Sequence, residues 1–187
     1  MQIESLDLRT VSEADALEIA KLLVSVWPKS KKTVAIRQRQ LIELGQKFDL
    51  HEELAPLSFL IRESGQLIAH SAVLPRAIGT SAGDLEIAGL TRVCTAPAQR
   101  GRGLGEIIVR PVFDLVDSKV YQFSLFQTTQ DVKPFYEKLG ACVIKNSIVN
   151  SLGTDLHESP FWDKVIMRYP SGGPWPEGEI DLRGPGY

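Results

Sequence analysis

The sequence predicts an α+β fold, in which a mixed, mostly antiparallel central sheet is flanked by helices. Its 187 residues suit one domain of ordinary globular composition, 43% hydrophobic and 24% charged. Helical and strand-like hydrophobic periods follow one another in the order β-α-α-β-β-β-α-β-α-β-β. Three strand patterns are consecutive in the middle of the chain, which favours an antiparallel meander within the larger sheet.

The N-terminal part is expected to contain one strand and two helices. Residues 3–9 alternate apolar and polar side chains, as a half-buried strand does. Thr10 or Ser12 is expected to cap a helix over residues 14–27, which stops before a proline. Apolar side chains at helical spacing over residues 31–48 predict the second helix.

The middle of the chain is expected to form the meander. Residues 57–62 and 66–74 are strand patterns joined by the turn Ser64-Gly65, which predicts a hairpin. Residues 85–95 form the third strand pattern and lead directly into a glycine-rich loop.

The C-terminal part is expected to add two helices, three strands and a tail. The elements are a helix over about residues 103–118, a strand over 120–126, a short helix capped by Asp131 and closed by Gly140, and strands over 142–149 and 165–169. Residues 171–187 are rich in proline and glycine, so we expect an irregular tail that packs on a domain formed by residues 1–170.

Composition argues against several classes of protein. The net charge of −2 is opposite to the basic excess of nucleic-acid-binding domains. No apolar run reaches membrane-spanning length, and the first residues lack the pattern of a signal peptide. Two cysteines, Cys94 and Cys142, indicate neither a disulfide framework nor a zinc cluster. We therefore expect a cytoplasmic protein with no metal, no nucleic-acid partner and no membrane partner.

The glycine-rich loop carries the strongest functional signal. In the stretch TAPAQRGRGLG, glycines at 101, 103 and 105 let main-chain N–H groups approach a ligand closely. Successive N–H groups and the start of a helix bind anions, and Arg100 and Arg102 supply full positive charges. A phosphate-bearing ligand is the expected partner of this loop.

Spacing excludes two common phosphate loops. A P-loop ends in Gly-Lys-Ser/Thr, whereas Gly105 is followed by Glu106-Ile107. A dinucleotide fingerprint needs a further glycine where Glu106 stands. The loop therefore belongs to another class of phosphate binder.

The loop resembles the pyrophosphate-binding loop of the GNAT superfamily of N-acetyltransferases, whose pattern is Gln/Arg-x-x-Gly-x-Gly/Ala. The segment FYEKLG, at residues 135–140, resembles the second motif of that superfamily. The likeness covers roughly residues 57–149. It implies the GNAT fold, with acetyl-CoA as co-substrate and a primary amine of a small molecule as acceptor.

Under this resemblance the loop binds the pyrophosphate of acetyl-CoA, and the preceding strand end pairs with the amides of the pantetheine arm. The residues implied in this binding are Val93, Cys94, Thr95, Arg100, Gly101, Arg102, Gly103, Leu104 and Gly105.

The resemblance also implies catalytic residues. Tyr136 matches the position of the general acid, since a phenol with a pKa of about 10 keeps its proton at neutral pH. A backbone N–H near Cys94 is expected to stabilise negative charge on the thioester oxygen, whereas the Cys94 thiol is expected to be buried and inert. Glu86 is the candidate general base, with a water relay or the carboxylate of Tyr187 as alternatives. His70 fits a satisfied sheet histidine.

The acceptor site is expected to include Thr91, Arg92 and Tyr187. The stretch GQLIAHSAVLPRAI and the aromatic end of the tail show a looser resemblance to the aminoglycoside 2′-N-acetyltransferases. Those enzymes hold their cationic substrate with an acid near the position of Thr91, and Arg92 would repel a polycation. Small amines, aminoglycoside-like sugars, polyamines and peptide N-termini all stay open as acceptors.

Other functions stay open as well. Because no general base stands out, the chain is compatible with a non-catalytic acyl-CoA-binding regulatory module. A protein or peptide N-acetyltransferase is a further alternative, and a homodimer is compatible with the resemblance.

Overall fold

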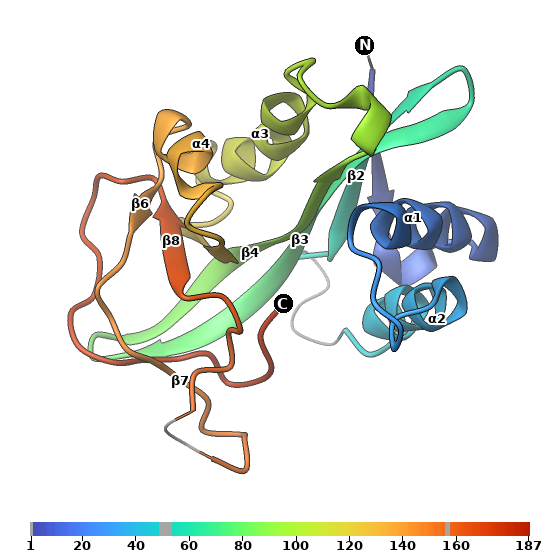
Figure 1. The fold of residues 1–187 in the computed structure, drawn as a ribbon. Helices are drawn as coiled ribbons and strands as arrows, with labels where there is room; N and C mark the ends of the chain where they lie inside the picture. Colours follow the sequence, from blue (N-terminus) through green and yellow to red (C-terminus); the bar gives the residue numbers. More distant parts are fainter. Residues whose placement is uncertain (1, 49–53, 156–157) are drawn as a thin grey trace. The chain divides into compact units, whose positions relative to one another are not determined.

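The computed structural model describes residues 2–48, 54–155 and 158–187 (Figure 1). The described chain forms two units. The first unit comprises Met1–Leu74 and Arg92–Pro111, and the second comprises Pro75–Thr91 and Val112–Tyr187.

The strands confirm the predicted mixed, mostly antiparallel sheet with helices on it. They are β1 (Ile3–Asp7), β2 (Leu57–Glu63), β3 (Gln66–Thr80), β4 (Gly83–Thr95), β5 (Phe123–Thr128), β6 (Cys142–Val143), β7 (Ile148–Val149), β8 (Val165–Tyr169) and β9 (Ile180–Asp181). Their order is β1-β2-β3-β4-β5-β8-β6, and β9 pairs with β3 and β7. The pairs β4–β5 and β7–β9 are parallel, whereas β1–β2, β2–β3, β5–β8 and β6–β8 are antiparallel.

The first unit begins as the hydrophobic pattern predicts. Asp7 caps a 3₁₀ turn, η1 (Leu8–Thr10), by accepting from the Arg9 N–H at 2.8 Å, so β1 ends two residues before the predicted bound. Ser12 caps α1 (Glu13–Val26) by accepting from the Asp15 N–H at 3.0 Å, which selects Ser12 over Thr10. Thr33 caps α2 (Val34–Gln46) in the same way.

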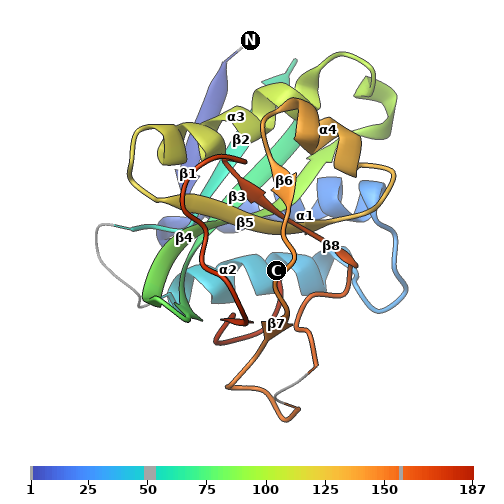
Figure 2. The ribbon, with the colours of Figure 1, turned by 90° about the vertical axis from the view of Figure 1, so that its left-hand side faces the viewer.

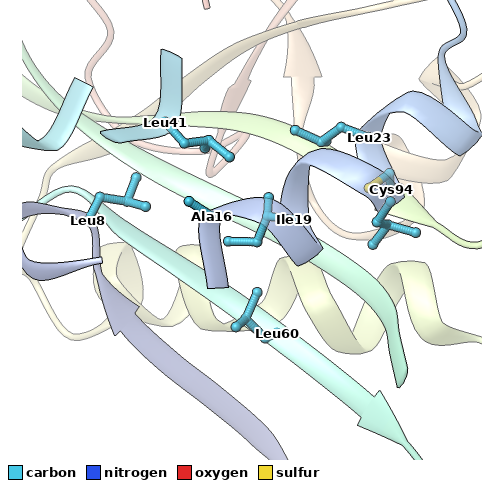
Figure 3. Packing of buried hydrophobic residues seen from close by; sticks show 8 residues of the cluster. Leu8, Ala16, Ile19, Leu23, Leu41, Leu60 and Cys94 are labelled. Carbon is cyan, nitrogen blue, oxygen red and sulfur yellow. The ribbon is translucent and has the colours of Figure 1, made fainter. Parts of the chain in front are cut away.

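The core of the first unit lies between α1, α2 and the sheet (Figure 3). Side chains of α1 and α2 meet Leu60 of β2 and Cys94 of β4. The buried members of this cluster are Leu8, Ala16, Ile19, Leu22, Leu23, Leu41, Leu60 and Cys94. Their burial holds the two helices, which lie side by side in Figure 1, on one face of the sheet.

The register of β2 and β3 defines the two faces of the sheet in this unit. Leu60 stands opposite His70, so both side chains point toward α1 and α2. Phe59 stands opposite Ser71 on the other face. There the Ser71 hydroxyl donates to the Ile108 carbonyl of α3 (Leu104–Asp117) at 2.6 Å. The first turns of α3 therefore pack on the face opposite α1 and α2.

The hairpin turn is confirmed, but β3 is longer than predicted. Ser64 (φ 50°) and Gly65 (φ 77°) both have positive φ, as a type I′ turn requires. β3 runs six residues past the predicted end at Leu74, through Pro75. Pairing with β2 stops at Val73, so the missing N–H of Pro75 breaks no bond of that ladder.

Three local predictions in the second unit are wrong. β5 begins at Phe123 rather than at residue 120, because the N–H groups of Val120 and Tyr121 fold back onto the Leu115 carbonyl. No side chain caps α4 (Lys133–Lys138), so Asp131 is not its cap.

The third concerns the C-terminal strands. The strand predicted over residues 142–149 is two short strands, β6 and β7, and the tail predicted to be irregular contains β9. The predicted β8 (Figure 2) is confirmed at its bounds. The division into a domain over residues 1–170 and a packed tail stays a prediction.

Candidate active site

The glycine-rich loop connects β4 to α3 in the first unit. A single 3₁₀ turn, η2 (Pro97–Gln99), leads into it. Gly101 (φ +80°) and Gly103 (φ +76°) adopt the left-handed conformation that other residues adopt only at a cost. A Cβ at either position would meet no atom within 4 Å. Backbone conformation, rather than crowding, therefore selects glycine at both positions.

The N–H groups of residues 101–105 lack backbone acceptors among the described residues. Within the described chain, none of the backbone hydrogen bonds outside the regular elements is donated by these residues. The N–H groups of Leu104 and Gly105, as the first of α3, have no acceptor within the helix. The helix N-terminus adds its partial positive charge. Consecutive N–H groups of this kind form a nest that suits phosphate oxygens.

The two arginines of the loop differ in their surroundings. Arg102 forms a bidentate ion pair with Glu63, at 3.0 Å from Nη1 to Oε2 and 2.7 Å from Nη2 to Oε1. Its Nη1 also donates to Gln99. Arg100 is exposed, and no ion pair involves it among the described residues. Among the described residues, the charge of Arg102 is therefore shared with Glu63, whereas that of Arg100 is not shared with a carboxylate.

The last residues of β4 lie beyond its parallel pairing with β5. The register joins Ile87 to Phe123, Ala88 to Ser124 and Gly89 to Leu125. Residues 90–95 of β4, which include Val93, Cys94 and Thr95, come after the last residue that this register pairs with β5. A strand edge of this kind offers main-chain groups to a ligand that carries amides.

The Cys94 thiol is part of the core. It is 5% exposed within the α1–α2 cluster (Figure 3), and burial raises its pKa to about 12. The thiol is therefore protonated at neutral pH and unsuited to act as a nucleophile. This agrees with the expectation that the thiol is buried and inert.

His70 holds the bend in β4 two residues before Cys94. Arg92 has φ +52°, a left-handed conformation that a non-glycine residue adopts only with support. His70 supplies it, with Nδ1 3.0 Å from the Arg92 carbonyl oxygen and Nε2 3.0 Å from the Ser58 hydroxyl. Because a carbonyl only accepts, Nδ1 carries the proton and Nε2 accepts from Ser58. Burial lowers the pKa of His70 to about 4, so the ring is neutral.

The Arg92 side chain shares the α1–α2 side of the sheet with a second arginine that the sequence prediction did not include. Arg37 lies on α2, and its Nη2 donates to the Trp27 carbonyl at the end of α1, at 3.2 Å. Its Nε and the Nη1 of Arg92 are buried and have no hydrogen-bond partner among the described residues. Burial, together with a smaller effect of the Arg37 charge, lowers the pKa of Arg92 to about 10. Both guanidiniums remain charged at neutral pH.

A sequence signal for Arg37 exists. Arg37 lies three residues after Val34 and four before Leu41, so it falls on the apolar stripe of α2 that faces the core. A charged residue on a core-facing stripe is unusual. The pattern could therefore have drawn attention to Arg37, but it could not show that Arg37 lies near Arg92.

The other predicted residues of β4 lie in the second unit. Thr91 is buried, at 6% exposure. Glu86 is exposed at the start of the strand. Burial, with a smaller effect of the Glu86 carboxylate, raises the pKa of Tyr121 to about 12.

Tyr136 lies on α4 with its ring in the core of the second unit. The ring contacts Phe126 and Phe135, with centroids 4.6 Å and 4.9 Å away, and burial raises the pKa of its phenol. Tyr136 is buried, at 5% exposure. Because burial raises the pKa of the phenol above its usual value of about 10, the phenol is protonated at neutral pH.

Tyr187 is anchored rather than exposed. Its hydroxyl donates to the Leu125 carbonyl at 2.9 Å, and its own carbonyl accepts from Gln127 at 2.8 Å. The Arg76 guanidinium lies 5.3 Å from the ring centroid. A role of Tyr187 in binding an acceptor stays a prediction.

Other features of the described residues give no alternative site. A surface hollow over α1 and α2, lined by residues such as Glu13, Gln38 and Arg39, contains none of the predicted site residues. No cluster of three or more His, Cys, Asp or Glu side chains there could hold a metal ion. No helix in the described part of the chain is long and apolar enough to cross a membrane.

Comparison with known proteins places the chain among acetyltransferases. Residues 7–144 match the family described as acetyltransferase (GNAT) domain. None of the curated proteins matches the sequence.

Solved structures share the fold at low sequence identity. A GNAT family acetyltransferase from Brucella melitensis, solved in complex with acetyl-CoA, has a TM-score of 0.60 and 16% identity, covering 96% of this chain and 95% of that one. ElaA from Escherichia coli has a TM-score of 0.56 and 14% identity, covering 89% and 97%. A GCN5-related N-acetyltransferase from Kribbella flavida has a TM-score of 0.56 and 16% identity. Its match covers 76% of this chain and only 33% of the Kribbella chain.

Proposed function

This chain belongs to the GNAT family of acetyltransferases, and we propose that it transfers an acetyl group from acetyl-CoA to a primary amine of a small molecule. The observation that carries the proposal is the nest of N–H groups over residues 101–105 at the start of α3. The complex of the Brucella melitensis protein with acetyl-CoA supports the choice of donor.

The residues of the first unit fit the chemistry of coenzyme A. The nest suits its pyrophosphate, and Arg100 adds an unpaired positive charge. The edge of β4 over Val93, Cys94 and Thr95 suits the amides of the pantetheine arm. When bound, acetyl-CoA supplies an acyl group activated as a thioester.

Two groups of the chain serve the reaction in this proposal. The Cys94 N–H, placed by the bend that His70 holds, donates to the acyl oxygen as negative charge develops on it. Tyr136 keeps its proton at neutral pH and donates it from Oη to the departing sulfur. Glu86 is the proposed base that accepts the proton of the acceptor amine, directly or through water.

Calorimetry with acetyl-CoA and a thiol-release screen of amine classes together test the proposal. We expect micromolar to millimolar binding of acetyl-CoA, as is usual for enzyme substrates, and thiol release with at least one amine class. Binding without thiol release across the panel would instead favour the regulatory acyl-CoA-binding module. Turnover confined to peptide N-termini would favour a peptide N-acetyltransferase, and no binding at all would overturn the proposal.

A cytoplasmic location and a homodimer are further proposals from the sequence. Cell fractionation tests the first, and light scattering of the purified protein tests the second.

A further inference from the structure

The arginine pair on the α1–α2 side of the first unit lacks a counter-charge. Arg37 lies on α2 and Arg92 lies at the bend in β4. Each has one buried guanidinium nitrogen that has no hydrogen-bond partner among the described residues. No Asp or Glu in the described chain forms an ion pair with either one. The charge of Arg37 acts on Arg92 closely enough to lower its pKa. Two like charges that interact in partly buried positions destabilise the protein unless an anion compensates them.

The fold compensates this cost only in part. The Trp27 carbonyl, which accepts from Arg37, ends α1 and carries part of the negative end of that helix dipole. Among the described residues the Arg92 guanidinium has no such carbonyl partner, because His70 binds the Arg92 carbonyl and not its side chain. The Nε of Arg37 and Nη1 of Arg92 remain as donors for an oxyanion, and guanidinium groups match the geometry of carboxylate and phosphate oxygens.

The position of the pair determines what the oxyanion belongs to. Arg92 is two residues before Cys94, whose N–H serves the acyl oxygen in the proposed function, and both residues lie on the edge of β4. The phosphates of acetyl-CoA are already provided for by the loop over residues 100–105. In the proposed function the acceptor is the other ligand that must reach the acyl carbon, so the oxyanion is assigned to the acceptor.

Resting on the proposed function, we propose that Arg37 and Arg92 bind an acidic group of the acceptor, so that the substrate is an amine that also carries a carboxylate or phosphate. An α-amino acid or a peptide-like acid meets this description, and a polyamine or aminoglycoside does not. Arg37 and Arg92 then select the substrate, while the reaction itself uses other groups.

The test compares amines that differ only in the acidic group. The panel pairs an amino acid with its carboxamide, and an aminoalkyl phosphate with the corresponding alcohol, which separates carboxylate from phosphate. A polyamine and an aminoglycoside are included. We expect the acidic member of at least one pair to have a kcat/KM at least 10-fold above its neutral partner. Equal rates within both pairs, or turnover confined to the polycations, would overturn the inference while leaving the acetyltransferase proposal intact.

Substitutions of Arg37 and Arg92 test whether these two residues cause the preference for acidic acceptors. Arg37→Leu and Arg92→Asn should raise KM for the acidic acceptor about 10- to 100-fold, with the KM for acetyl-CoA and for the neutral partner unchanged. Asn tolerates positive φ, so it suits position 92. Arg39→Leu, an exposed arginine on the same helix, is the matched control and should change none of these values.

Thermal unfolding measures binding of the acidic amine without requiring acetylation. The acidic amine should raise the Tm of the wild-type protein more than its neutral partner does, and Arg37→Leu should remove that difference. In the absence of ligand, Arg37→Leu should raise the Tm, because it replaces an uncompensated charge by an apolar side chain. A lower Tm for this variant together with an unchanged acceptor preference would show that Arg37 is structural.

Discussion

His70 holds the bend in β4 that precedes Cys94. Its neutral ring joins the Arg92 carbonyl of the bend to the Ser58 hydroxyl of β2, and it lies entirely out of solvent. His70 is therefore a positioning residue, whose contribution depends on its remaining uncharged.

The stability of the protein should fall as the pH drops below about 6.5. The pKa of His70 is 6.5 without the fold and about 4 in the fold, so the unfolded chain binds an additional proton between these values. The contribution of His70 is complete above pH 6.5 and is lost as the pH approaches 4, to a total of about 3 kcal/mol. Urea unfolding of the wild type and His70→Gln across this range measures it. A wild-type slope no steeper than that of the variant would contradict the prediction.

Tyr136→Phe should lower turnover without loss of the fold. The ring packs against Phe126, and this contact survives the substitution, whereas the proton at Oη does not. We expect a kcat reduced roughly 100-fold or more, with acetyl-CoA binding unchanged. Phe135→Leu, on the same helix, controls for packing. Intact turnover of Tyr136→Phe would remove its catalytic role.

At the scale of elements, α2 is held close to the first 3₁₀ turn by a glycine. A Cβ on Gly45 would stand 1.8 Å from the Leu8 carbonyl oxygen and 2.4 Å from its carbon. Both atoms are backbone, so no side-chain rotation relieves the overlap. The same helix presents Arg37, which makes the placement of α2 a determinant of the site.

Gly45→Ala should destabilise the protein although alanine is the better helix former. The higher helix propensity of alanine stabilises the protein by about 1 kcal/mol. The forced displacement of α2 costs more, so the free energy of unfolding should fall by about 1–3 kcal/mol in total. Chemical denaturation measures it. Gly172→Ala is the control, because a Cβ there meets nothing within 4 Å. Equal stabilities of the two variants would contradict the predicted close packing.

The loop before α3 should respond to substitution through its backbone. Gly103→Ala places a Cβ in open space but at positive φ, so the nest must change conformation or bear a strain of about 1 kcal/mol. We expect weaker acetyl-CoA binding with a small loss of stability. Calorimetry compares this variant with Gly103→Asn, which tolerates the conformation better and should bind more tightly than the alanine variant.

At the scale of the whole molecule, the chain passes between its two units inside regular elements. β3, β4 and α3 each contribute residues to both units. In the second unit the tail is tied down by ordered contacts: Arg168 donates to the carbonyls of Pro170, Ser171 and Gly172, and Arg183 pairs with Asp84. A disturbance in one unit should therefore reach the other through the shared strands.

Tyr187→Ala should lower the stability of the entire chain. The substitution removes a buried aromatic ring, its hydrogen bond to Leu125 and its contact with Arg76, at a cost of about 3–5 kcal/mol. Because strands are shared, we expect one unfolding transition at a lower Tm, seen alike by hydrogen exchange in both units. Tyr187→Phe, which loses only the hydroxyl, should cost about 1 kcal/mol. Loss of protection confined to the tail would contradict this coupling.

Local chemistry decided much of this protein before any tertiary contact. Some signals act within a few residues of the chain, namely the hydrophobic periods, the helix caps at Ser12 and Thr33, and the turn Ser64-Gly65. The helices and strands that depend on these signals were therefore predicted, with errors mainly at their ends. The loop at residues 100–105 is equally local, because glycine conformations and a helix start create its nest. The failures came where distant residues intervene, as at the start of β5 and the division of residues 142–149.

The sequence by itself thus determined the class of fold, most of the order of elements and the glycine-rich loop between β4 and α3, since each depends on near neighbours along the chain. Only the tertiary structure decided that the charge of Arg37 on α2 acts on Arg92 of β4, that His70 is neutral beside the bend, and that Tyr187 is anchored by Leu125. These relations depend on strand register and helix packing between residues far apart in sequence, which no local pattern encodes.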